Sequence, residues 1–154
     1  MKNAMKPAIA FGTVIQALAD RLGFNLFAAD GSGIKIESDG YMELNITAYG
    51  SRIVAVNHCK YIGEWGESCY DPEIQFWIDA NGNWYPISYE NQQLGIFNMY
   101  VTFKEGNPDR FYRSQQHDLA HFCVTWAANI KDQGFMTSDA VTWFGQQPPK
   151  QEVS

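Results

Sequence analysis

Basic residues are missing from the middle of this chain. Between Lys60 and Lys104 there is no Lys or Arg, although six acids lie there: Glu64, Glu67, Asp71, Glu73, Asp79 and Glu90. The chain of 154 residues has 17 acids and 11 basic residues, so the remaining 11 acids balance the bases. The net charge of −6 therefore arises inside this one stretch. A surface of this sign repels phosphates, so we expect no direct binding to nucleic acid.

Long apolar runs and metal-type cysteine spacings are also missing. No run reaches the roughly 18 apolar residues that a membrane span needs, so we expect no contact with a membrane. The three cysteines, Cys59, Cys69 and Cys123, are an odd number at no metal-ligand spacing. We interpret them as reduced thiols of a cytoplasmic protein, with Cys123 in the core. A bridge between Cys59 and Cys69 across a hairpin stays open.

The first apolar segment allows two interpretations. Lys2 and Lys6 precede it, and Ala17-Leu18-Ala19 resembles a signal-peptidase site. A helical stripe, however, runs through that site and consists of Phe11, Val14, Ile15, Leu18 and Leu22. We therefore predict an amphipathic helix over residues 8–22, which ends at Gly23.

Alternating apolar and polar residues predict β-structure in the middle of the chain. The expected strands cover residues 34–37, 41–49, 52–60, 73–79, 84–89 and 95–103, and residues 61–70 form a loop that contains Trp65. A second helix is predicted over residues 110–133, ending before Gly134, with Phe135 packed back on its last turn. Residues 139–144 are expected to form a short helical turn, and residues 146–154 a disordered tail.

This order predicts a single α+β domain over residues 1–145. An antiparallel meander sheet of five to six strands would carry the N-terminal helix and the long C-terminal helix on one face, in two layers. The other sheet face would be polar and rich in rings. Its expected residues are Tyr41, Glu43, Asn45, Tyr49, Gln75, Trp77, Asn98 and Tyr100.

The histidines resemble known sites only superficially. His117-Asp-Leu-Ala-His121 is similar to the zinc metalloprotease pattern, but both rings fall opposite the apolar stripe of the second helix, so we expect a solvated helix. His58 and Cys59 are neighbours on a strand and point to opposite faces. The sequence has no nucleophile elbow and no phosphate-binding loop before a helix. We therefore assign no catalytic residue, cofactor or metal.

The acidic hairpin over residues 71–89 suggests three functions. Our main hypothesis is a docking surface for a protein with a basic surface, in which indoles anchor the partner and carboxylates pair with its Arg or Lys side chains. The residues assigned to this surface are Trp65, Asp71, Glu73, Trp77, Asp79 and Trp84. One alternative is a metal-assisted enzyme that uses Asp71, Glu73 and a histidine. The other is a structural module that forms a homo-oligomer.

Several segments also resemble a known family. They are Asp71-Pro-Glu-Ile-Gln-Phe76, Trp84-Tyr-Pro-Ile-Ser-Tyr89, Leu94-Gly-Ile-Phe97 and a helix with Phe122, Trp126, Asn129 and Ile130 that ends in Gly134-Phe135. Together they are similar to a bacterial domain family catalogued as being of unknown function, with Ile74 where its members have Met. The resemblance covers residues 34–135. It implies a protein encoded on plasmids, integrated elements or phages, and it implies no catalytic residue.

Overall fold

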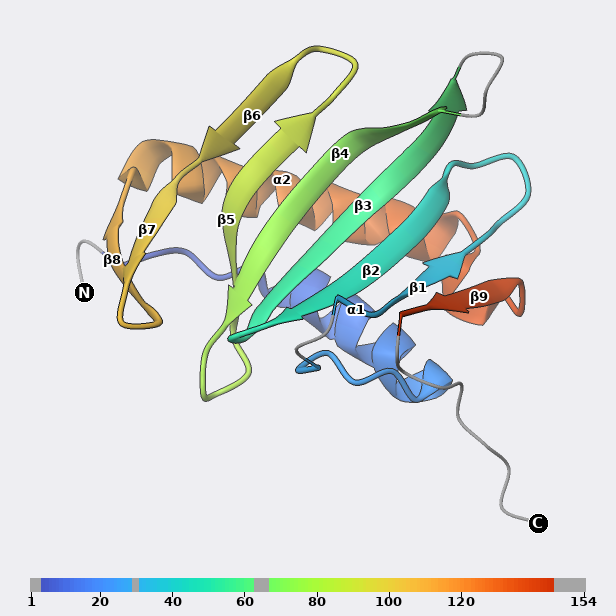
Figure 1. Ribbon diagram of the computed structural model, residues 1–154, viewed down its shortest axis with the longest axis horizontal. Helices are drawn as coiled ribbons and strands as arrows, with labels where there is room; N and C mark the ends of the chain where they lie inside the picture. The colour runs from blue at the N-terminus through green and yellow to red at the C-terminus, as the bar shows by residue number, and fades with distance from the viewer. Residues whose placement is uncertain (1–3, 29–30, 63–66, 146–154) are drawn as a thin grey trace.

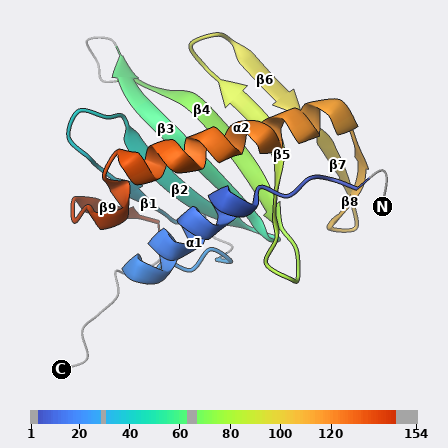
Figure 2. The same cartoon turned by 180° about the vertical axis from the view of Figure 1, so that it is seen from behind.

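The protein is a two-layer α+β domain. The computed structural model describes residues 4–28, 31–62 and 67–145, with side chains described in these ranges except at 60–62 and 67–69. The elements are α1 (Ile9–Leu22), β1 (Gly33–Ile36), β2 (Glu43–Gly50), β3 (Ile53–Ile62), β4 (Glu67–Ile78), β5 (Trp84–Asn91), β6 (Ile96–Met99), β7 (Val101–Lys104), β8 (Asn107–Phe111), α2 (Arg113–Asp132), a 3-10 turn (Phe135–Thr137) and β9 (Val141–Phe144). Both helices lie on one side of the sheet (Figures 1 and 2).

The sheet is an antiparallel meander with one strand added at its end. Its seven strands lie in the order β6-β5-β4-β3-β2-β1-β9, and β7 and β8 form a separate hairpin. The predicted fold class is therefore confirmed, with more strands than expected. The extra strand is β9, which pairs with β1 from Ile36 opposite Val141 to Gly33 opposite Phe144.

Four predicted elements were wrong in their bounds or type. The predicted loop over residues 61–70 contains the end of β3 and the start of β4, and the predicted strand 95–103 divides into β6 and β7, which belong to different sheets. Residues 141–144 form a strand rather than a helical turn, because β1 offers them an open edge. The long helix begins at Arg113 instead of residue 110, since residues 107–111 pair with β7 as β8. The predicted tail, residues 146–154, lies outside the described residues.

Helix α1 ends as its sequence predicts. Gly23 adopts a left-handed conformation with φ of 72°, which favours glycine. Its N–H donates to the carbonyl oxygen of Asp20, and the N–H of Phe24 donates to that of Ala19. These two bonds form the Schellman arrangement that satisfies the last carbonyls of a helix. Neither described helix is long and apolar enough to cross a membrane.

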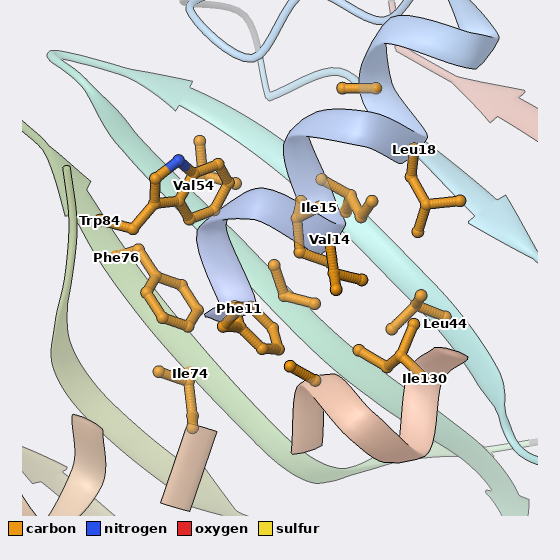
Figure 3. Packing of buried hydrophobic residues seen from close by; sticks show 14 of the residues in the cluster. Phe11, Val14, Ile15, Leu18, Leu44, Val54, Ile74, Phe76, Trp84 and Ile130 are labelled. Carbon is orange, nitrogen blue, oxygen red and sulfur yellow. The ribbon is translucent and has the colours of Figure 1, made fainter. Parts of the chain in front are cut away.

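The core lies between the helices and one sheet face. Phe11 of α1 stacks on Phe76 of β4 with ring centroids 4.8 Å apart, and contacts Trp126 of α2 at 4.7 Å. Ile74 and Ile78 flank Phe76 on the same side of β4, as the alternation in the sequence predicted. Figure 3 shows Phe11, Ile74 and Phe76 close together where α1 meets the sheet. Burial of such rings and branched chains supplies the main driving force for folding.

Candidate functional site on the open sheet face

The sheet face opposite the helices, here called the open face, is uncovered by any helix in the described chain (Figure 1). Its residues form rows across the strands, because directly opposed residues of antiparallel strands share a face. The longest row crosses all seven strands, and its part on β2 to β6 is called the central row. The central row consists of Asn45, Asn57, Glu73, Glu90 and Phe97. Beyond Asn45 the same row continues with Lys35 of β1 and Thr142 of β9.

Hydrogen bonds join one half of the central row. Asn45 Nδ2 donates to Asn57 Oδ1 over 3.0 Å, and Asn57 Nδ2 donates to Glu73 Oε1 over 3.2 Å. Asn57 is nearly inaccessible to water even though it lies on the open face. A buried amide must have its partners in place, so this chain fixes the Glu73 carboxylate at the centre of the sheet.

Two carboxylates face each other in the other half of the row. Glu73 lies directly opposite Glu90, and neither belongs to the ion pairs found among the described side chains. Burial raises the pKa of Glu73; the hydrogen bond from Asn57 opposes this, and the charge of Glu90 adds to it. Directly opposed like charges destabilise a sheet. This pair of negative charges therefore lowers the stability of the fold.

Tyrosines surround these carboxylates. Burial raises the pKa of Tyr49 and of Tyr70, and the negative charge of Glu73 contributes to both shifts. The two rings border a hollow of about 360 Å³ on the open face. The other residues lining the hollow are Gly31, Lys35, Glu43, Asn45, Thr47, Asn57, Cys59 and Phe144. Lys35 and Glu43 form an ion pair there, with 3.6 Å between Nζ and Oε1.

Trp77 lies at the C-terminal end of β4 and Asp79 directly follows that strand, where the sequence predicted a binding hairpin. Trp77 is half-buried on the open face beside Tyr85, and its Nε1 has no hydrogen-bond partner among the described residues. Asp79 closes the reversal by accepting hydrogen bonds from the backbone N–H groups of Asn81 and Asn83. The slight burial of Asp79 raises its pKa, but the bonds from Asn83, Asn81 and Tyr85 outweigh it and lower the pKa overall.

Asp71 is set apart from Glu73 by a bulge. Asn57 lies opposite Glu73 and Cys59 lies opposite Tyr70, so two residues, Asp71 and Pro72, face the single residue between them on β3. The carboxylate of Asp71 accepts from Asn91 Nδ2 over 2.7 Å, whereas Glu73 accepts from Asn57. The strict alternation behind the expected Asp71–Glu73 pair is therefore interrupted.

Trp84 requires a correction. It was assigned to the docking surface, but the structure places it in the core, 3% exposed and in edge-on contact with Phe76. Its register explains this position, because Trp84 lies opposite Ile78, which faces inward. Trp65 lies outside the described residues. Of the six assigned residues, the structure places Glu73 and Trp77 on the open face.

The outer-face residues were predicted correctly in the centre of the sheet and wrongly at its edge. Asn98 lies opposite Tyr89, which packs against Phe122 of α2, so Asn98 belongs to the helix side. Phe97 and Met99 take the open side, opposite Glu90 and Ser88. Tyr41 lines a separate hollow on the helix side with His58 and Trp126. The edge strand is exposed on both faces, so its polarity pattern does not indicate which face is inward.

The histidines lie in three different settings. His58 faces Trp126 and Phe135, whereas Cys59 lines the hollow on the open face, so their predicted opposition is confirmed. His121 is exposed, and His117 Nε2 lies 3.0 Å from the carbonyl oxygen of Ala4. Among the described residues no three His, Cys, Asp or Glu side chains are grouped so as to hold a metal ion. The side chain of Cys69 is not described.

The fold and the open face define a small α+β domain with a fixed pair of carboxylates that no described side chain neutralises, on the sheet face opposite the helices. The chain belongs to the family described as Domain of unknown function (DUF6908), whose model matches residues 14–136. The match includes most of α1 and so begins earlier than the resemblance over residues 34–135 predicted. Searches of the curated proteins and of the solved structures found no match.

Proposed function

We propose that this protein binds another protein through its open face, and that the partner presents Arg or Lys side chains to the Glu73–Glu90 pair. The observation that carries this proposal is the direct opposition of these two carboxylates without a basic neighbour among the described side chains. A partner's cation would relieve their repulsion. Binding would then be favoured by the free energy that this repulsion costs the isolated domain.

The rings on the same face supply the apolar part of such a contact. Tyr49 is half-exposed, and Phe97, at the end of the central row, is more exposed still. Tyrosine rings also attract cations that lie over their faces, and guanidinium groups make this contact most often. The proposed footprint therefore replaces the hairpin surface of the sequence hypothesis with the central row and its neighbours Tyr49, Tyr70 and Trp77.

The biological setting is part of the proposal. A protein encoded on a mobile element and present in the cytoplasm would meet host-defence or nucleic-acid-handling complexes, whose grooves are basic because they bind phosphates. A row of carboxylates on a rigid sheet has the charge to occupy such a groove in place of nucleic acid.

The proposal is tested by mapping the contact with a defined probe. We expect an arginine-rich peptide, titrated into isotope-labelled protein, to shift the backbone amide resonances of Asn57, Glu73 and Glu90 first. Binding should weaken as salt is added, because exposed charges are screened. The full chain, used as bait in a host lysate, would then supply a natural partner for the same measurement.

A matched pair of variants separates the site from net charge. Glu73→Gln with Glu90→Gln should abolish most peptide and partner binding. Asp118→Asn with Asp132→Asn changes the net charge equally, but on the exposed side of α2, and should leave binding nearly unchanged. Equal losses in both double variants, or resonance shifts confined to the helices, would overturn the proposal.

A further inference from the structure

The edge strand β6 is unusually exposed and apolar for the border strand of a sheet. It lies at one end of the strand order (Figure 1), and all four of its residues are exposed. Phe97 is 57% exposed and Met99 is 43% exposed, although both are large apolar side chains. Leu94 and Ile96, which precede them along the chain, are exposed as well. Several exposed apolar side chains on one short segment favour an interaction surface.

Backbone groups of β6 are also turned toward the open edge. The N–H of Tyr100 donates to the carbonyl oxygen of Ile87 over 2.8 Å. In an antiparallel pair, residues alternate between bonding to the neighbouring strand and facing away from it. Counting back from Tyr100, the N–H and C=O groups of Phe97 and Met99 face away from β5. Only another extended backbone matches this spacing of donors and acceptors.

The usual protections of an edge strand are missing here. Natural sheets discourage edge pairing with charged residues or proline on the border strand. The chain has neither between Glu90 and Lys104. A second copy of the same strand therefore meets no like charge within β6, which makes an identical strand a suitable neighbour.

We propose that β6 pairs antiparallel with β6 of a second copy about a twofold axis at Asn98. In this register Phe97 faces Met99 of the second copy, and Met99 faces its Phe97. Both pairs then bond through the outward backbone groups, which gives four hydrogen bonds. The Met sulfur meets an aromatic ring in each pair, a favourable contact. Because the arrangement is isologous, it closes as a dimer.

The axis stands perpendicular to the sheet, so the two open faces lie side by side on one surface. The helices of both copies lie on the opposite side. A contact made by one short strand is small compared with the roughly 800 Å² per partner of a standard interface. The dimer therefore dissociates on dilution.

Sedimentation at increasing concentration tests the proposal with the unmodified chain. The mass should rise from 17.5 kDa toward twice that value. Hydrogen exchange followed residue by residue should show the amides of Phe97 and Met99 slowing as concentration rises, with no such change at the opposite edge, β9. A mass of 17.5 kDa at every concentration would overturn the proposal. So would a dimer in which these two amides still exchange freely.

Two variants test whether β6 forms the interface. Met99→Pro removes an outward donor without touching the bonds to β5, and Phe97→Lys places a charge on the edge. Each should shift the dimerisation midpoint by about tenfold in concentration, because the twofold axis applies each change twice: Met99→Pro removes two hydrogen bonds, and Phe97→Lys replaces two apolar contacts with charges. Phe144→Lys, the same change on β9, should leave the midpoint in place. Equal effects of Phe97→Lys and Phe144→Lys would contradict the assignment of the interface.

Discussion

The indole N–H of Trp126 donates a hydrogen bond to Nε2 of His58 over 2.8 Å, across the boundary between α2 and the sheet. Because Nε2 accepts, the ring proton must lie on Nδ1, which is 3.2 Å from the carbonyl oxygen of Glu43 and donates to it. Both ring nitrogens are thus satisfied in the neutral imidazole. A second proton would place two donors against each other.

This relationship predicts a loss of stability in acid. Burial lowers the pKa of His58 below its ordinary value of 6.5, although bonds to backbone carbonyls oppose the shift. The unfolded chain therefore takes up a proton at higher pH than the folded chain, and the free energy of unfolding falls as pH drops below 6.5. The free energy of unfolding should stop falling once the pH is below the pKa of His58 in the folded chain. Urea unfolding at a series of pH values measures this slope.

The matched variant for this measurement is His58→Gln. A glutamine amide accepts from the Trp126 indole without titrating, so the variant should lose the slope below pH 6.5 even where its overall stability is lower. An unchanged slope would assign the acid sensitivity to another group.

The Glu73–Glu90 opposition predicts a stabilising substitution. Glu73→Gln preserves an acceptor for Asn57 and removes the like-charge pair, so we expect the free energy of unfolding at neutral pH to rise by about 0.2–1 kcal/mol. The raised pKa of Glu73 agrees in sign: the folded chain holds this proton to higher pH than the unfolded chain, so stability falls as pH rises above the ordinary 4.5. Urea unfolding of both proteins decides the sign.

Glu43→Gln is the control on the same face. Glu43 pairs with Lys35, so its neutralisation should lower the free energy of unfolding by about 0–1 kcal/mol. If both variants changed stability in the same direction, the opposition of Glu73 and Glu90 would not be the cause.

The contact between α1 and Trp84 predicts an unusual result for a glycine in a helix. Helix propensity alone predicts that Gly12→Ala stabilises by about 1 kcal/mol. A Cβ at this position would lie 2.6 Å from Cδ1 of Trp84, which is held between α1 and Phe76. Overpacking of this kind costs about 1–3 kcal/mol, so we expect a net loss of stability in thermal unfolding. A gain would mean that the indole can move aside.

Local signals predicted much of the fold. The stripe of α1 and its stop at Gly23 are properties of adjacent residues, and so is the inward alternation of Ile74, Phe76 and Ile78. The prediction for the segment of β9 was wrong for the same reason. The intrinsic preference of four residues is too weak to decide their structure when they can pair with the edge of a strand that is distant in the sequence. Its strand state depends on pairing with β1.

The candidate site was harder to predict because it depends on register. The sequence identified Glu73 and Trp77 as residues of one face, but not that Asn57 and Glu90 would flank Glu73 on neighbouring strands. Trp84 could have been placed correctly, since a hairpin that puts Ile78 inward must put its opposite residue inward as well. The exposed edge of β6 follows only from the strand order.

The position of β9 beside β1 has a consequence for synthesis. More than 100 residues separate Ile36 from Val141, so during synthesis β1 waits with one border unpaired while the meander assembles. A nascent or truncated chain that ends after the 3-10 turn would present that border to its neighbours. Premature termination in the last segment should therefore yield insoluble protein even though the meander itself is complete.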